Sequence, residues 1–465
     1  MKLLRQTQPT TLITRRQMLE ASFAVSAGMG LCEFSARVGH AAPSKKWLTI
    51  TDIERTTVKL PYRETSGRNM ARELPHWAWT EIIEVTLKSD QVGIGETLLY
   101  YTWGATGDDD VARARGKNAA AMMWDDTLGA GLQMALFDAV AKSAGVPIHA
   151  LLGTKQNETT PVGWWNIDTS AADMASECQE AYRQGYRGYK TKGRPWYDVW
   201  QQIEEVAKVM PDDFHFAMDF NDTLLDAERG IPILKELEAI APKHLIWETP
   251  IFQSDVPGNQ AIRKTCRGKV AMHYGDPDPL VAIREDVCDG FVVGGGATKL
   301  MGIGHVAEMG EKSFWLQLVG TGITAAWSLQ FGGVLRNATW PAVNCHQLYR
   351  HSLLVDPIRM VEGVADVPDR PGIGIELDRD VIARFRVDKP KSRPDPPRLI
   401  ETRWPDGRTM YLANTEVNFV LNAARKGVTP YFERGVDTRL VPNDGSKVWR
   451  ERYERARTAP FIVKQ

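Results

Sequence analysis

Two lysines separated by one residue are the side chains of this chain best suited to proton transfer. Lys190 and Lys192 stand at the end of a short segment that begins at Gly188. Side chains two residues apart on a strand point the same way. Two ammonium groups in one site repel each other, which favours the neutral form of one and makes a lysine usable as a base near neutral pH. The spacing predicts a catalytic lysine; the alternative is an exposed pair at a strand end.

Three carboxylates follow, each at the point where an apolar segment meets a loop. They are Asp219, Glu248 and Asp276. Carboxylates that meet at one place repel one another unless a cation lies between them, and an all-oxygen ligand set favours Mg²⁺. Taken together the three predict a site for one divalent cation, Mg²⁺, whereas any one of them alone is more often a helix cap.

The elements that must position these residues are short apolar segments alternating with amphipathic ones after Pro161. That rhythm is typical of parallel βα units. The expected strands are 162–166, 188–192, 214–219, 245–248, 270–274, 290–293, 314–319 and 342–345. Eight strands in sequence predict a closed α/β barrel, in which the carboxyl ends of the strands form the active face.

The chain before and after this repeat has a different pattern. Alternating apolar residues at 50–59 and 79–88, followed by 93–96, predict a small antiparallel sheet, and apolar positions in 126–143 predict a helix. Polar, aromatic loops at 62–77 and 98–110 are expected to recognise a ligand. Residues 389–465 are rich in Pro, Arg and charge, and we expect a surface extension without chemistry of its own.

Composition excludes several classes of protein. The 465 residues are 43% hydrophobic and 25% charged, as in a folded protein large enough for two cores. Lys and Arg total 57 against 58 for Asp and Glu, so no overall charge favours nucleic acid or an anionic membrane. The five cysteines lack zinc-site spacing. The expected partner is a small-molecule carboxylate.

Residues 1–42 have the order of an export signal. Arg15 and Arg16 precede a modestly apolar run, and small residues end the segment at Ala42. The arginine pair resembles the twin-arginine type, which predicts a periplasmic protein; the alternative is a cytosolic amphipathic tail with a chance Arg-Arg pair. Nothing later reaches ~18 uninterrupted apolar residues, so we expect no stable membrane anchor.

Several stretches together resemble the mandelate racemase and muconate lactonizing enzyme branch of the enolase superfamily, over residues of about 50–387. They are the helix 131–138 with its Gly-Val-Pro sequel, the Lys190-x-Lys192 strand, the carboxylate series and 371–378. Singly, only the lysine pair and the carboxylate series are specific. Enzymes of this superfamily are a known example of a Lys or His base that works with magnesium.

The resemblance implies a modified TIM barrel, (β/α)7β, with an N-terminal α+β capping domain and a C-terminal extension. The implied boundaries are 47–155 for the cap, 158–350 for the barrel, 351–388 for a return to the cap and 389–465 for the extension. It implies Lys192 as the base, Lys190 as its electrostatic neighbour, and Asp219, Glu248 and Asp276 as metal ligands. It also implies a homo-oligomer.

This sequence departs from the family pattern at three places. Asp276 is one methylene shorter than the usual glutamate, so nearby His273 is a candidate to assist. The sixth strand, 291–296, has no ionisable side chain before Lys299, and residues 316–324 contain none of the usual acid or base groups. A racemase needs a proton acceptor and a donor on opposite faces, so these absences favour a lyase.

The remaining candidates follow from position along the chain. His346, near the eighth strand, is a candidate acid, with a surface or capping histidine as the alternative; His351 is a weaker one. The expected substrate contacts are Trp164, Trp165, Asn166, Arg194, Trp196, Asn221, Tyr100, Tyr101 and His273. The aromatic members of this set are equally compatible with packing roles.

These observations lead to one preferred function and three alternatives. The preferred one is a Mg²⁺-dependent dehydratase acting on an acid sugar or related hydroxy-carboxylate, with the α-proton removed by Lys192. A cycloisomerase or an epimerase of a lactone or acid sugar uses the same first step. A carboxylate-binding protein that kept the fold without turnover is the non-enzymatic alternative.

Overall fold

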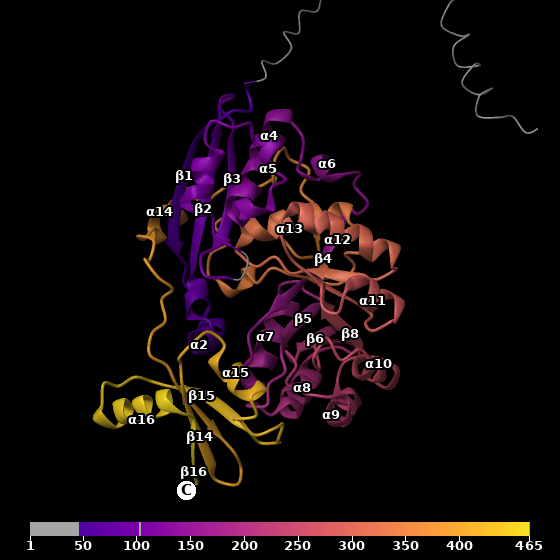
Figure 1. Ribbon diagram of the computed structural model, residues 1–465, viewed down its shortest axis with the longest axis vertical. Coiled ribbons are helices and arrows are strands. Elements are labelled where there is room, and N and C mark those ends of the chain that lie inside the picture. Colours follow the sequence, from indigo (N-terminus) through magenta and orange to yellow (C-terminus); the bar gives the residue numbers. More distant parts are fainter. Residues whose placement is uncertain (1–45, 102–103, 465) are drawn as a thin grey trace, which may run out of the picture. The chain divides into compact units, whose positions relative to one another are not determined.

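The computed structural model describes residues 46–101 and 104–464 (Figure 1). The expected export signal, residues 1–42, and Cys32 lie outside the described residues. Within the described chain, no helix combines the length and the apolar character needed to cross a membrane.

The N-terminal part is an antiparallel sheet packed against a buried helix. Its strands are β1 (Ile50–Lys59), β2 (Trp79–Leu87) and β3 (Val92–Leu98), in the order β1-β2-β3. Its helices are α2 (Glu64–Glu73), η1 (Pro75–Ala78), α3 (Asp108–Ala114), α4 (Ala119–Met122), η2 (Asp126–Leu128), α5 (Ala130–Ala144) and α6 (His149–Leu152). Helix α5 packs on β3 (Figure 1). A Cβ at Gly95 would overlap the carbonyl oxygen of Gly131, so glycine permits this close approach.

Eight parallel strands form the central sheet, which confirms the predicted barrel. They are β4 (Thr159–Trp165), β5 (Gly188–Lys192), β6 (His215–Asp219), β7 (His244–Glu248), β8 (Lys269–His273), β9 (Gly290–Val293), β10 (Ser313–Leu316) and β11 (Ala342–Val343). Their order is β10-β9-β8-β7-β6-β5-β4-β11, and a parallel bridge between Gln317 and Val343 joins the two end strands. The strands are buried on both faces, so they read as short continuous apolar runs.

Helices alternate with these strands and explain several aspartates. They are α7 (Ala171–Arg183), α8 (Val199–Val209), α9 (Ala227–Ile240), α10 (Val256–Thr265), α11 (Pro279–Arg284), α12 (Ala297–Met309) and α13 (Gly322–Val334). Asp198, Asp226 and Asp255 cap α8, α9 and α10 by accepting backbone N–H bonds. Asp219 and Glu248 are instead the last residues of β6 and β7, so the capping alternative does not apply to them.

Residues after the barrel return to the N-terminal sheet. After η3 (His346–Leu348), β12 (Val364–Asp366) pairs antiparallel with β4, and α14 (Arg379–Phe385) lies against β1. Asp138 of α5 accepts N–H bonds from Ile94 and Ile373, both at 2.7 Å. Burial raises the pKa of Asp138 despite these bonds and the Lys142 ammonium. This carboxyl therefore ties α5 to β3 and to the returning chain.

The C-terminal residues form a third sheet with its own apolar cluster. Its elements are β13 (Leu399–Arg403), β14 (Arg408–Ala413), α15 (Phe419–Arg425), β15 (Asp437–Val441), α16 (Lys447–Thr458) and β16 (Phe461–Lys464), drawn in yellow in Figure 1. The strand order is β15-β13-β14-β16. Trp196 and Tyr197, from the loop after β5, are buried in the cluster with Ile400, Met410 and Phe419. The loop after β5 is thus shared by the barrel and this sheet.

Candidate active site

Lys192, Asp219 and Glu248 lie in one line across three adjacent strand ends. Lys192 on β5 is in register with Asp219 on β6, which is in register with Glu248 on β7. Because parallel neighbours in register lie about 4.8 Å apart, these three side chains start close together. The barrel sheet therefore assembles the predicted lysine and two of the three predicted carboxylates.

Each lysine of the Lys190-x-Lys192 pair faces a different carboxylate. Lys192 Nζ lies 2.5 Å from Asp219 Oδ2 and donates to Asn221 Oδ1 at 3.2 Å. Lys190 Nζ makes a close ion pair with Glu248 and donates to Gln317 Oε1 at 2.7 Å. The expected repulsion between two ammonium groups is therefore offset by paired charges.

The two lysines differ in their access to solvent. The side chain of Lys192 is 16% exposed and lines a cavity, whereas that of Lys190 is 4% exposed and lies beneath it, 4.7 Å from the centre of the Trp315 ring. Burial by itself raises the pKa of Glu248, but Lys190 and His273 outweigh burial and hold its pKa below the usual range. Lys192 is thus placed for proton transfer, and Lys190 for neutralising a buried carboxylate.

The cavity at the barrel mouth has a volume of about 320 Å³. It receives side chains from the N-terminal part, from the strand ends and from the C-terminal sheet. The lining residues are Leu74, His76, Trp77, Tyr100, Tyr101, Trp165, Ile167, Lys192, Arg194, Asp219, Asn221, His273, Gln317, Val319, Val343, Cys345, Val417, Asn418, Leu421 and Arg425. Six of the nine residues expected to contact substrate are in this set.

The other three lie elsewhere, and for Trp164 the reason is that neighbouring positions on a strand face opposite sides. Trp165 lines the cavity, but Trp164 is fully buried toward α7, where its indole N–H donates to Glu177 at 2.8 Å. Asn166 is likewise fully buried outside the lining. Trp196 donates to Asp168 at 2.7 Å within the C-terminal apolar cluster. The structure therefore places Trp164, Asn166 and Trp196 outside the lining of this cavity.

His346 also lies outside the cavity lining. Its Nε2 is 2.9 Å from the hydroxyl of Tyr186, and burial lowers the pKa of His346 to about 4. An imidazole with that pKa is neutral near pH 7 and has no proton to donate as an imidazolium. Its position and its charge therefore do not support the expected role as catalytic acid.

Asp276 is exposed and is not among the residues that line the cavity. His273, three residues earlier, instead places its Nε2 3.1 Å from Glu248 Oε1. The backbone of this loop is held by Gln253, which accepts from the N–H of His273 at 2.8 Å and donates to the carbonyl of Asp276. The structure thus brings His273, and not Asp276, into contact with Glu248.

The buried carboxylates fit a divalent cation in one respect. Both oxygens of Glu248 are buried and receive no hydrogen bond of good geometry from the described residues, although both are in ion-pair contact. Oxygen atoms with unused capacity are suited to a hard cation. In residues 46–101 and 104–464, no three His, Cys, Asp or Glu side chains converge as a preformed metal-binding group, because lysines hold the two carboxylates.

Comparison with known proteins agrees with this geometry. The family described as Enolase C-terminal domain-like matches residues 173–381. D-galactarolactone cycloisomerase of Agrobacterium fabrum is 27% identical over 56% of this chain and 74% of that protein. D-gluconate dehydratase of Thermoproteus tenax is 22% identical over 55% of this chain and 56% of that protein. Residues 173–381 of this chain thus match an enolase-type domain, and its relatives and the solved structures of similar fold come from the mandelate racemase and muconate cycloisomerase branch of the enolase superfamily.

The superfamily fold covers only part of the chain. The crystal structure of muconate cycloisomerase from Pseudomonas fluorescens aligns with a TM-score of 0.59 and 18% identity, over 73% of this chain and 99% of that one. The part of this chain outside that alignment is longer than residues 1–45 alone. The family match, in turn, ends at residue 381. Members of the enolase superfamily are enzymes that generally use a divalent metal ion, usually Mg²⁺.

Several residues that line the active-site cavity were not predicted from the sequence. Gln317 was not predicted because it is neutral, and near the seventh strand only acid and base side chains were considered as site residues. Trp77 lies in the stretch 62–77, whose aromatic and polar composition predicted a ligand-recognising loop without singling out this residue. It stacks on Trp165 with ring centres 5.6 Å apart and meets Tyr101 edge-on at 4.9 Å. Val417, Asn418, Leu421 and Arg425 belong to the extension, which was expected to have no chemistry of its own, and they line the cavity.

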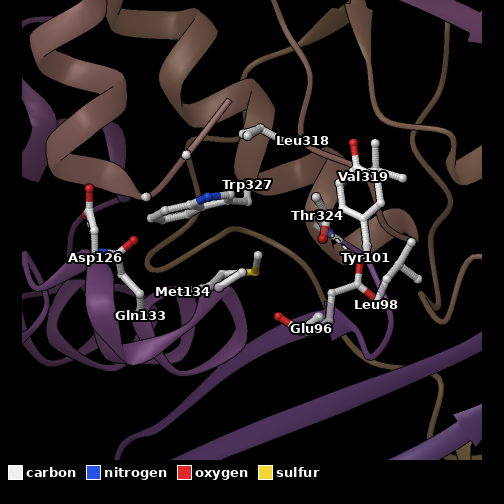
Figure 2. A pocket seen from close by; sticks show the side chains of 14 residues that line it. Glu96, Leu98, Tyr101, Asp126, Gln133, Met134, Leu318, Val319, Thr324 and Trp327 are labelled. Carbon is white, nitrogen blue, oxygen red and sulfur yellow. Dashed lines mark hydrogen bonds between the residues drawn. The ribbon is translucent and has the colours of Figure 1, made fainter. Parts of the chain in front are cut away.

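A smaller cavity adjoins the main one. It has a volume of about 50 Å³ and shares Tyr101 and Val319 with the active-site cavity. Figure 2 shows Glu96 in its lining beside Thr324, together with Met134 and Trp327. Glu96 accepts the N–H groups of Thr321 and Thr324 at 2.6 and 2.8 Å, so a carboxylate from β3 binds the N-terminus of α13. This contact holds the N-terminal part against the barrel.

Proposed function

We propose that this protein removes the proton α to a substrate carboxylate, with Lys192 Nζ as the acceptor. The observation that carries the proposal is the position of Lys192, which lines the cavity in register with two buried carboxylates. A base must lie within hydrogen-bond reach of the proton it takes. Of the two lysines on β5, only Lys192 lines that cavity.

Other residues of the chain position and balance this base. Asn221 and Asp219 accept from Lys192 Nζ and so orient it. Asp219 and Glu248, with His273 beside them, are the residues that would hold a divalent cation. When bound, such a cation supplies positive charge that stabilises a deprotonated carboxylate substrate. The Lys190 ammonium is engaged with Glu248 and Gln317 beneath the cavity.

The distribution of acid and base groups favours a reaction that works from one face. Strand β9 ends in Val292 and Val293, and the end of β10 presents the neutral Gln317. A racemase or epimerase needs a second acid or base opposite the first, whereas an elimination does not. We therefore propose a lyase of the dehydratase kind, a class to which the relative D-gluconate dehydratase belongs by name.

A cycloisomerase is the second candidate. The relatives include D-galactarolactone cycloisomerase, and a solved structure similar in fold is that of muconate cycloisomerase. Ring closure or opening beside the carboxylate also needs only one face of the substrate to meet the base. The two candidates differ in whether a molecule of water leaves.

The cavity lining limits the substrate body. Polar groups gather at the strand ends, whereas Leu74, Ile167, Val417 and Leu421 add apolar surface around the Trp77 and Trp165 rings. Aromatic and aliphatic walls bind C–H faces better than hydroxyl groups. We propose a hydroxy-carboxylate with an apolar or ring-shaped body, which is less hydroxylated than the acid sugar expected from the sequence.

The test is NMR of the Mg²⁺-supplemented protein in D₂O with a panel of hydroxy-carboxylates, acid sugars and lactones. Wild type is compared with Lys192→Ala and with Lys243→Ala, which removes an exposed lysine paired with Asp212. We expect loss of the α-proton signal in wild type and Lys243→Ala only. A 2-keto product identifies the dehydratase, and a cyclised or ring-opened isomer of the substrate identifies the cycloisomerase. Undiminished exchange in Lys192→Ala would refute the assigned base.

We also propose that residues 1–42 direct export to the periplasm. The supporting observation is the Arg15-Arg16 pair ahead of an apolar run. Cell fractionation of wild type and of the Arg15→Lys, Arg16→Lys double variant tests this. Retention of the variant in the cytoplasm is expected, and equal export of both proteins would contradict a twin-arginine signal.

A further inference from the structure

Helix α15 of the C-terminal sheet forms part of the active-site cavity wall. Asn418, Leu421 and Arg425 line the cavity together with Val417, which precedes the helix. These residues lie beyond residue 381, where the match to the superfamily ends. This wall therefore lies outside the part of the chain that the family model matches, and it borders the cavity that Lys192 lines.

Arg425 reaches from α15 to the loop that follows Asp219. Its Nη2 lies 2.7 Å from Asp222 Oδ2, and its Nε donates to the backbone carbonyl of Asn221 at 3.2 Å. Asp222 is itself partly buried. Burial raises the pKa of Asp222, and this effect is larger than the lowering of its pKa by Arg425. The extension is thus joined directly to the end of the strand that carries Asp219.

A second guanidinium, that of Arg194, contacts the same loop. Arg194 Nη2 donates to Asn221 Oδ1 at 2.6 Å, and its Nη1 donates to the carbonyl of Phe220 at 3.1 Å. Arg194 is 4% exposed, and its Nε is buried without a hydrogen-bond partner among the described residues. A buried donor without a partner is costly, so this group favours a bound acceptor.

The charges around Asn221 do not balance. Lys192, Arg194 and Arg425 each donate to Asn221, and the carboxylates facing them in the described structure are Asp219 and Asp222. The positively charged side chains therefore outnumber these carboxylates by one. The surplus lies at the cavity wall that includes α15. Guanidinium groups bind carboxylates with paired N–H donors, so this surplus fits an acidic group of the ligand.

We propose that Arg425 of α15, together with Arg194, binds a second acidic group of the substrate. The substrate class is then a dicarboxylate: one carboxylate lies beside the carbon deprotonated by Lys192, and the other lies against the two guanidinium groups. This inference rests on the proposed function for the first carboxylate only. Arg425 is a specificity-determining residue supplied by the C-terminal sheet.

The test measures binding by titration calorimetry in Mg²⁺-containing buffer. The probes are the diacids succinate, glutarate and adipate and the monoacids butyrate, valerate and hexanoate of matched chain length. In wild type we expect at least one diacid to bind roughly tenfold or more tightly than its matched monoacid, as a charge-assisted hydrogen bond permits. Equal binding of every pair would overturn the proposal.

Two variants and one control locate the effect. Arg425→Gln is expected to abolish the preference for the diacid, whereas Arg434→Gln, which alters an exposed arginine of the same sheet paired with Glu204, is expected to retain it. Asp222→Asn removes the competing carboxylate and is expected to tighten diacid binding, which keeps a test available if Arg425→Gln fails to fold. Equal losses in Arg425→Gln and Arg434→Gln, or weaker binding in Asp222→Asn, would contradict the proposal.

The outcome is separable from that of the proposed function. Diacid preference without α-proton exchange in any compound would support the Arg425 assignment and refute the assigned chemistry. Exchange in monoacids, with no preference for diacids, would support Lys192 as base and refute the Arg425 assignment.

Discussion

Lys192 Nζ lies 2.5 Å from Asp219 Oδ2, across one rung of the parallel barrel. One rung further, Glu248 is held by Lys190, so two lysines of one strand neutralise carboxylates on two successive strands. The difference in exposure between them, 16% against 4%, separates their roles. Lys192 borders the cavity, while Lys190 stabilises a charge that water cannot reach.

This relationship predicts that replacing Lys190 mainly lowers the stability of the fold, whereas replacing Lys192 mainly abolishes activity. Lys190→Met leaves the fully buried Glu248 without its ammonium, a change that typically costs about 3–5 kcal/mol in unfolding free energy. Lys192→Met acts at a more exposed position and is expected to cost less while abolishing α-proton exchange. Urea unfolding in the presence of a metal chelator measures the order. A larger loss of stability in Lys192→Met would contradict it.

The position of His273 predicts which residue assists the buried carboxylates in binding a cation. His273→Ala is expected to weaken Mn²⁺ and Mg²⁺ binding by roughly tenfold or more, as loss of a group that holds a ligand does. Asp276→Asn is expected to leave binding unchanged, because Asp276 is exposed and outside the cavity. Calorimetric titration of the metal-free protein compares them. A loss confined to Asp276→Asn would restore the assignment made from the sequence.

Arg72 is predicted to be the main buried charge joining three parts of the chain. It is 3% exposed and contacts Asp168 Oδ2 at 3.0 Å, Glu73 at 3.0 Å and the hydroxyl of Tyr197 at 2.5 Å. Arg72→Met leaves two buried carboxylates short of a partner and is expected to cost about 3–5 kcal/mol. Arg68→Met, on the same helix, removes a half-exposed pair with Asp173 and is expected to cost about 0–1 kcal/mol. Thermal or urea unfolding of both variants tests the contrast.

The lowered pKa of Glu401 predicts that the free energy of unfolding depends on pH. Burial raises the pKa of Glu401, but the Tyr411 hydroxyl and Arg439 outweigh burial and lower it overall. A carboxyl whose pKa is lower in the folded state adds stability above its unfolded pKa of about 4.3 and loses it as the pH falls through the folded pKa. Urea unfolding should show wild type more stable than Glu401→Gln at about pH 7, with the gap shrinking toward about pH 3. A constant gap would contradict the assigned pKa shift.

The sequence determined the barrel and the central residues of the site for a local reason. Short apolar runs at regular intervals specify parallel strands, and the period of two along a strand puts Lys190 and Lys192 on one side. The end of each strand marks Asp219 and Glu248 before any contact is known, because all these ends meet at one face. Such features depend on residues close together in the chain.

Tertiary structure alone decided which neighbours of those residues face the cavity. Trp164 and Trp165 have the same chemistry, and only the orientation of β4 sends the first toward α7 and the second into the cavity. His273 lies beside Glu248 because it is the last residue of β8, whereas Asp276 lies three residues further along the loop. Arg425 reaches Asp222 across 203 residues of sequence, and such packing follows from the burial of the C-terminal cluster, which no local pattern encodes.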